Sequence, residues 1–297
     1  MKARTIIGLS TLLLAAFAAT EVWKSGPAHY ACAPLGRHHH SWPRTANIVY
    51  SIPGYKPLGE RAALFTRAAY VPGARMSAAF QALPGRQVFT FSDPMAIRNP
   101  WLPLATLVLD VLDGTVSGQT DHVERSVLQG QSKTFMINGV AVQALVAEDK
   151  ESVGGQLAEI TDDYFAQDDK GTVHYLGENA TQYTNGVPSG HAGSWLYGVD
   201  TNFIGTIFPG YPKVGQTWEA ENVPTPGVGV EHDVLISNVA TVTVPAGTFR
   251  NCMETQELSN EGSENKWYCP SVGVVEEYAS STDVVTLTSH QASYTLP

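Results

Sequence analysis

The chain has 297 residues, of which 43% are hydrophobic and 15% are charged, and its formal net charge at pH 7 is −10. These values are those of a globular chain long enough for one or two domains, and they exclude a disordered or membrane-embedded protein. Because phosphate binding needs a basic surface, the acidic balance argues against a nucleic-acid partner.

The first 19 residues have the pattern of a secretory signal peptide. Lys2 and Arg4 form a short positive region that precedes the apolar run TIIGLSTLLLAAFAA. Residues 16–18 (AFA) fit the small-x-small rule for cleavage, so we expect a mature chain that begins near Ala19. An uncleaved anchor is the alternative, but the run is short for a bilayer span of about 20 residues. We therefore predict a secreted or periplasmic protein with no transmembrane span in its mature part.

Residues 20–98 form a basic segment rich in proline, glycine and alanine. The segment has nine basic and three acidic side chains, a net charge of +6, whereas the chain from Asn99 onward has seven and 25, a net of −18. Apart from the helix-like run ERAALFTRAAYV it shows little periodicity, and we interpret it as a weakly structured arm. Its positive charge allows two interpretations. In the first, the arm packs against the acidic part of the chain from Asn99 onward; in the second, it contacts an anionic membrane surface or an acidic polymer.

The arm also contains the candidate metal ligands, which are His38, His39 and His40, with His29 and Cys32 nearby. Imidazole and thiolate groups are suitable ligands for copper and zinc. Three consecutive histidines in one extended segment cannot all face one ion, however. We therefore predict no cofactor and keep the three histidines as candidates only.

From Asn99 onward, short runs of alternating apolar and polar residues are typical of β-strands. Asn138-Gly139 lies between two such runs and predicts a tight hairpin. The sequences DDKG at 168–171 and PAG at 245–247 predict two further turns. No later run has helical periodicity over more than a few residues, and the sequence predicts an all-β fold.

Two parts of this region resemble each other, which indicates an internal repeat. The runs that begin at Gly139 and Gly247 both follow a hairpin turn and lie 108 positions apart, and YFAQDDKGTV matches WYCPSVGVV with one deletion. We therefore predict a duplicated antiparallel sheet module, either an open half-barrel or sandwich-like. Its first β unit is expected at 99–200 and its second at 201–297.

Export permits disulfide bonds, and the chain has three cysteines. Cys252 and Cys269 lie in two β-like runs and fall opposite one another if those runs pair as a hairpin centred near 260–261. We predict a disulfide between them, with two buried free thiols as the alternative. Cys32 is then free or paired between molecules.

A dense group of possible metal ligands occurs in the run DDYFAQDDKGTVHYLGE, which starts at Asp162. A calcium loop of the EF-hand type needs glycine at its sixth position, which is Gln167 when counted from Asp162 and Val173 when counted from Asp168. Aspartate opens β-turns and glycine closes them. We therefore interpret residues 168–171 as a structural turn.

The runs YFAQDDKGTVHYLGE, TVTVPAGTFRNCMETQE and WYCPSVGVVEEY resemble a family of bacterial exported proteins without an assigned activity. That family carries a YxAQDxxGNVWYxGE-like hairpin, a TVPAGTFxN turn and a YYxPGVGLV ending. The resemblance covers about Asn99 to Tyr278 and leaves out the arm. His174 stands where the family often has an aromatic residue, and the first repeat lacks the family's PGxxW. The resemblance implies export and an all-β fold, and it implies no catalytic residues.

Aromatic residues cluster between the two predicted β units, and the candidate ligand-binding residues are Trp195, Tyr197, Phe208, Tyr211 and Trp218. Core filling is one interpretation of this cluster. A groove for a lipid-like or saccharide ligand is the other, because clefts between domains often hold ligands. We predict a non-catalytic exported protein that binds such a ligand or another envelope component. The alternative is an exported hydrolase that uses paired carboxylates or a bound metal.

Overall fold

The computed structural model describes residues 89–223, 228–259 and 262–293, so the predicted signal peptide and most of the predicted arm lie outside it. A 3₁₀ turn, η2 (Leu104–Thr106), precedes the strands. The first seven strands are β1 (Leu107–Val116), β2 (Gln119–Ile137), β3 (Val140–Val153), β4 (Gln156–Gln167), β5 (Val173–Thr184), β6 (Val187–Gly190) and β7 (Trp195–Leu196). The other seven are β8 (Gly205–Phe208), β9 (Thr217–Val223), β10 (Gly229–Val244), β11 (Gly247–Ser259), β12 (Gly262–Cys269), β13 (Gly273–Ser280) and β14 (Asp283–Ala292).

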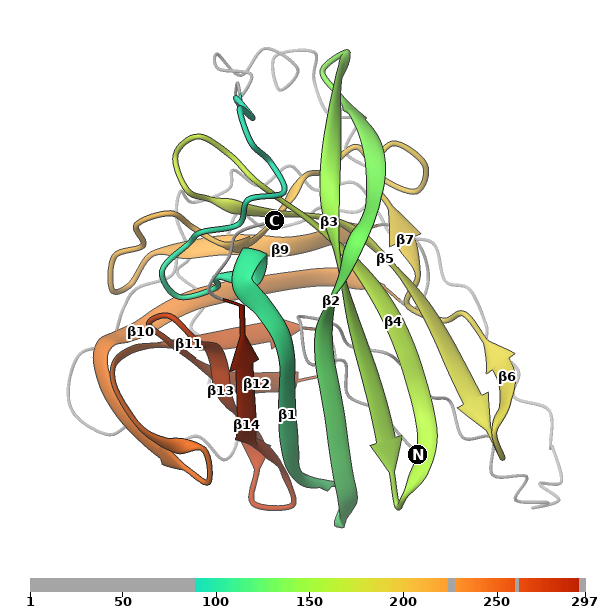
Figure 1. Ribbon diagram of the computed structural model, residues 1–297, viewed down its shortest axis with the longest axis vertical. Helices are drawn as coiled ribbons and strands as arrows, with labels where there is room; N and C mark the ends of the chain where they lie inside the picture. The colour runs from blue at the N-terminus through green and yellow to red at the C-terminus, as the bar shows by residue number, and fades with distance from the viewer. Residues whose placement is uncertain (1–88, 224–227, 260–261, 294–297) are drawn as a thin grey trace, which may run out of the picture. The chain divides into compact units, whose positions relative to one another are not determined.

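The strands form one antiparallel sheet that is not closed (Figure 1). Their order is β6-β5-β4-β3-β2-β1-β14-β13-β12-β11-β10-β9, and β7 and β8 both pair with β5. Chain neighbours are therefore sheet neighbours along most of the order, except where β1 lies beside β14. The predicted all-β fold is confirmed, and it is a single sheet that is not closed, in line with the open alternative of the prediction and not with the sandwich-like one. The duplication and the division near residue 200 stay predictions.

Short turns with left-handed residues set the register of the main hairpins. Asn138 and Gly139 have φ values of 54° and 85°, and they join β2 to β3 where the sequence predicts a hairpin. Positive φ at both central residues matches the right-handed twist of the strands. The predicted turn at 245–247 is also present, because Val244 pairs with Gly247 across the ends of β10 and β11.

β8 pairs with β5 and also lies against β9, so the two sides of the open sheet approach each other there. Gly205 on β8 shows how tight this approach is. A Cβ atom at this position would lie 2.0 Å from the carbonyl oxygen of Ala220 on β9 and 3.1 Å from that of Tyr175 on β5. No side chain larger than hydrogen fits there, so glycine allows β8 to lie between the two ends.

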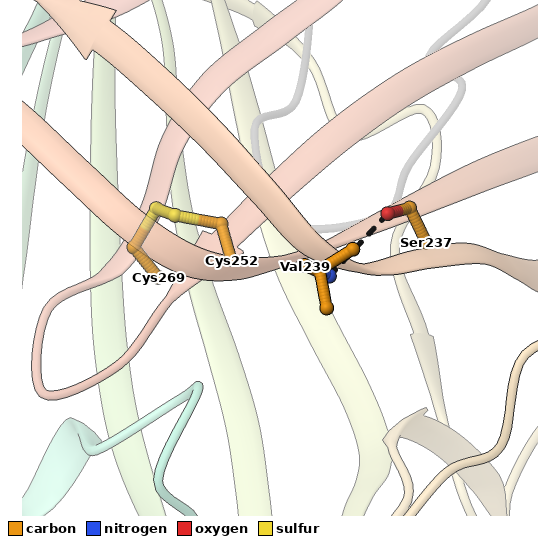
Figure 2. The surroundings of a disulfide bond; sticks show 4 residues. All are labelled: Ser237, Val239, Cys252 and Cys269. Carbon is orange, nitrogen blue, oxygen red and sulfur yellow. Dashed lines mark hydrogen bonds between the residues drawn. A yellow bond between two sulfur atoms is a disulfide. The ribbon is translucent and has the colours of Figure 1, made fainter.

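The predicted disulfide between Cys252 and Cys269 is present, and it joins β11 to β12 (Figure 2). The two strands pair from Met253 opposite Tyr268 to Ser259 opposite Gly262, so they form the antiparallel pair that the prediction requires, while its expected centre at 260–261 lies outside the described residues. Both cysteines are completely buried in a hydrophobic cluster of β1, β2 and β10–β14. The bond therefore links two neighbouring strands inside the core.

The two faces of β4 and β5 both carry apolar residues at the end next to η2. Phe165 and Tyr175 belong to the larger hydrophobic cluster, which also contains Trp218 of β9. Tyr164 and Leu176, which alternate with them, belong to a separate cluster on the opposite face. Successive side chains point to opposite faces of a strand, so this end of the sheet is covered on both sides.

Candidate functional site

The turn between β4 and β5 is built around the carboxylate of Asp168. Its Oδ1 accepts hydrogen bonds from the backbone N–H groups of Lys170 and Thr172, each at 2.9 Å, and Gly171 has a φ of 83°. Aspartate holds turns in this way, and glycine supplies the positive φ that closes them. The predicted structural turn over these residues is confirmed.

The same carboxylate orients a buried histidine. His174 Nε2 lies 3.2 Å from Asp168 Oδ2, and His174 Nδ1 lies 3.3 Å from the carbonyl oxygen of Gly205. The ring of Phe89 approaches the imidazole edge-on, with ring centroids 4.4 Å apart. Burial raises the pKa of Asp168, but the hydrogen bonds from His174, Thr172 and Lys170 outweigh it and hold the pKa below its usual value.

Residues 89–99, the end of the predicted arm and the first residue after it, lie along this turn. Asp169 accepts hydrogen bonds from the backbone N–H and the hydroxyl of Ser92, at 2.8 and 3.1 Å. The side-chain oxygen of Gln167 accepts the backbone N–H groups of Arg98 and Asn99, both at 2.8 Å. These contacts fix Phe89 and its neighbours beside His174 without a helix or a strand.

A second loop, residues 209–216, packs on the other side of the turn. Asn99 Nδ2 donates to the carbonyl oxygens of Gly171 and Pro209, at 2.9 and 3.2 Å. At Gly210 a Cβ atom would lie 2.2 Å from the carbonyl oxygen of Lys170, so the two backbones touch. Three segments that are distant in sequence are thus held together at this end of the sheet.

These segments enclose a pocket of about 490 Å³. Aromatic and apolar groups form part of its wall, and they are Phe89, Phe203, Ile204, Pro209 and Trp218. Polar and charged groups form the rest, and they are Asp168, Lys170, Thr172, His174, Thr206, Gln216, Thr217 and Glu219. A pocket of this size with mixed walls is typical of a small-molecule site.

The charged groups of the pocket differ in how far they are already engaged. Asp168 and His174 are buried and bonded to each other and to the backbone, so they serve the geometry of the wall. Lys170 is exposed, and Glu219 is half-buried beside His232 and Asn222, at 3.6 and 3.2 Å. The pocket therefore presents one ammonium and one carboxylate group at its accessible part.

The five predicted ligand-binding residues do not form one surface. Trp218 lines the pocket. Trp195 and Phe208 are buried in the larger core cluster, and Tyr197 is half-buried against the cluster on the other face. Tyr211 is 80% exposed on the 209–216 loop, between pocket residues Pro209 and Gln216 of the same loop.

Several pocket residues are not indicated by the sequence. Phe89 belongs to the predicted arm, and Asp168 and His174 belong to a hairpin that is interpreted as structural. The aromatic-rich run between β7 and β9 is the one signal that points here, because it contains Phe203 and Trp218. The wall joins segments up to 130 positions apart, and local patterns do not predict that contact.

Paired carboxyl groups, which the hydrolase alternative requires, occur deeper in the fold. The Tyr175 hydroxyl donates to Asp163 Oδ1 at 2.6 Å and contacts Glu178 Oε2 at 3.3 Å. Burial and neighbouring carboxyl groups raise the pKa of Asp163 and of Glu178 well above their usual values. Both side chains are at most 1% exposed and face the core, not the pocket.

The described residues bear on the metal and membrane predictions in two ways. His38, His39 and His40 lie outside the described residues. Within residues 89–223, 228–259 and 262–293, no group of three or more His, Cys, Asp and Glu side chains is arranged to hold a metal ion. The same residues contain no helix of the length and apolarity that crossing a bilayer requires.

Comparisons with protein-family models, with curated proteins and with solved structures find no match to this chain. The resemblance to bacterial exported proteins therefore stays a prediction from the sequence. The disulfide and the lack of a membrane-spanning helix among the described residues are compatible with export.

Proposed function

We propose that this chain is an exported, non-catalytic binding protein and that its pocket binds a small saccharide. The observation that carries the proposal is the mixed wall of the pocket, in which Trp218 and Phe203 lie among hydroxyl, amide and carboxylate groups. Aromatic faces pack against the C–H surface of a sugar ring, while the polar groups take its hydroxyls. The volume of about 490 Å³ accommodates a ligand of more than one ring.

A lipid-like ligand fits this wall less well. An acyl chain would cover Lys170, Glu219 and the threonine hydroxyls without offering them hydrogen bonds, and such burial is costly. A saccharide replaces the water on these groups with hydroxyls of its own. The polar part of the wall is therefore the reason to prefer the saccharide.

The test is a binding titration of the mature protein with a panel of mono- to tetrasaccharides, in which tryptophan fluorescence and calorimetry measure the affinity. Thr217 lines the pocket and is exposed, so Thr217→Trp fills the site without disturbing the core. We expect this variant to lose about tenfold or more in affinity. Thr241→Trp, at an exposed position of β10 outside the pocket, is the matched control and should bind as the native protein does.

Failure of the whole panel to bind would overturn the saccharide proposal. If lipid from an envelope extract co-purifies with the native protein but not with Thr217→Trp, the result would support a lipid-like ligand instead of a saccharide. Native affinity in both tryptophan variants would place the ligand outside the pocket.

A further inference from the structure

Four buried carboxyl groups face one another on three neighbouring strands. Glu231 of β10 lies directly opposite Glu221 of β9, and Asp233 of β10 lies directly opposite Glu257 of β11. These side chains are between 2% and 6% exposed. Like charges at directly opposed positions destabilise a sheet, and burial increases the cost of ionisation. We call these four residues the β9–β11 carboxyl cluster.

One ammonium group serves this cluster among the described residues. Lys266 of β12 is 1% exposed, and it forms an ion pair with Glu257 and lies 4.0 Å from Glu264. The other titratable groups that act on the cluster are Asp163 of β4, Tyr175 and Glu178 of β5 and Tyr268 of β12, and Glu277 of β13 acts on Lys266. Most of these groups are acidic, so a single lysine leaves the cluster with an excess of carboxyl groups.

Glu231 shows where this excess is concentrated. It is 2% exposed, and neither oxygen of its side chain has a hydrogen-bond partner. A buried carboxylate needs a cation or a donor, and the described residues do not form a metal-binding group here. A proton is the cation that this geometry can accept, because it needs no coordination sphere.

The electrostatic environment of the cluster also favours the protonated carboxyl groups. Burial raises the pKa of Glu231 well above its usual value, Glu257, Asp233 and Glu221 raise it further, and Lys266 lowers it. Burial likewise raises the pKa of Asp233 and of Glu221, with Lys266 acting in the opposite direction. Above the usual carboxyl pKa the folded protein thus binds protons that the unfolded chain has released. The free energy of unfolding therefore decreases as pH rises, until the raised pKa values are passed.

We propose that the β9–β11 carboxyl cluster is a proton-responsive switch, which holds protons near neutral pH and loosens β9 and β10 when it loses them. β9 is the end strand of the hydrogen-bonded order and pairs with β10. Repulsion between Glu221 and Glu231 acts directly across this ladder. The proposal does not depend on the ligand of the pocket.

The first test measures the thermal midpoint of the mature protein between pH 5 and pH 9. We expect it to fall by several degrees as pH rises, and Glu231→Gln, which cannot ionise, should reduce this fall by about half. Glu254→Gln on β11, a half-buried residue that bonds to Asn265, is the control and should keep the native pH dependence. Equal slopes for the native protein and Glu231→Gln would overturn the proposal.

The second test needs no variant and applies even if Glu231→Gln does not fold. Infrared spectroscopy of the native protein at pH 7 should show the carbonyl stretch of protonated carboxyl groups, to which Asp163 and Glu178 also contribute, and this band should disappear at alkaline pH. Hydrogen exchange, corrected for its intrinsic pH dependence, should then increase in β9 and β10 more than in β2 and β3. Absence of the band at pH 7, or a uniform increase in exchange, would contradict the switch.

Discussion

His290 and Asp110 form an ion pair at the junction where β14 meets β1. His290 Nδ1 lies 2.6 Å from Asp110 Oδ1, and Asp110 is 2% exposed. The hydrogen bond to Asp110 raises the pKa of His290, burial lowers it, and the aspartate charge raises it, so that the net shift is upward. A raised histidine pKa contributes stability that is complete below the usual pKa of about 6.5 and is lost as pH rises through the folded value.

Asp110→Asn is therefore expected to lower the pKa of His290 and to remove this part of the pH dependence of stability. The pKa is measured by NMR titration of the imidazole C–H signals. His122 is a useful internal reference in the same spectra, because its partner is Asp113, at 2.7 Å. If the His290 titration is the same in the variant and in the native protein, the pairing is not present in solution.

Asp168 closes the β4–β5 turn with hydrogen bonds to two backbone N–H groups and to His174. Asp168→Ala leaves these partly buried donors without their acceptor, which costs about 1–3 kcal/mol. We expect the free energy of unfolding, measured with urea, to fall by this amount. Asp169→Ala removes the neighbouring exposed carboxylate and should cost less. Equal effects of the two substitutions would contradict the role of Asp168.

Among the elements, the β11–β12 hairpin contains the only covalent cross-link of the described chain. The bond between Cys252 and Cys269 closes a loop with a sequence separation of 17. In the chain-entropy model a loop of this size stabilises the fold by about 3 kcal/mol. The double variant Cys252→Ala/Cys269→Ala should lower the free energy of unfolding by this amount. A reduced native protein is the control, and it should be destabilised to a similar degree.

The hairpins show which part of the fold the sequence predicts. Asn138-Gly139, the turn at Asp168 and the turn before Gly247 depend on residues within a few positions of each other, and all three are present. The pairing of β8 with β5 is different. It requires Gly205 of β8 to lie against Ala220 of β9, which is 15 residues further along the chain. No periodic pattern in the sequence predicts such a contact.

The candidate site is less predictable than the strands for the same reason. Trp218 is the one predicted ligand-binding residue that lines the pocket, and it also belongs to the core cluster that contains Trp195 and Phe208. The sequence does not distinguish an aromatic residue that fills the core from one that lines a pocket, because tertiary packing decides between the two roles. Phe89 reaches the pocket because Ser92 and Asp169 fix its segment, which is a contact across 77 positions.

At the scale of the whole molecule, a buried arginine connects strands from the early and the late part of the sequence. Arg125 of β2 is 2% exposed and makes a two-pronged contact with Asp149 of β3, at 3.0 Å for each nitrogen. Its Nη2 also lies 3.7 Å from Glu277 of β13, far along the sequence. Arginine suits this position, because its planar group serves several carboxylates and stays charged when buried.

Arg125→Met is expected to cost about 3–5 kcal/mol, because it leaves Asp149 buried without its cation. Chemical denaturation measures the loss. Lys150→Met is the control, since Lys150 pairs with Glu124 in an exposed contact that is worth about 1 kcal/mol or less. A loss for Arg125→Met as small as that of the control would show that the buried pair adds little to stability.

The short outer strand β6 has a consequence for how copies of this molecule meet. It ends the hydrogen-bonded order, it is four residues long, and it contains Pro188, which has no backbone N–H to offer. A second copy that approaches this margin finds no long row of free donors and acceptors to extend. An open sheet is thereby kept from growing into a fibre at that margin, and the molecule can leave its sheet unclosed without polymerising there.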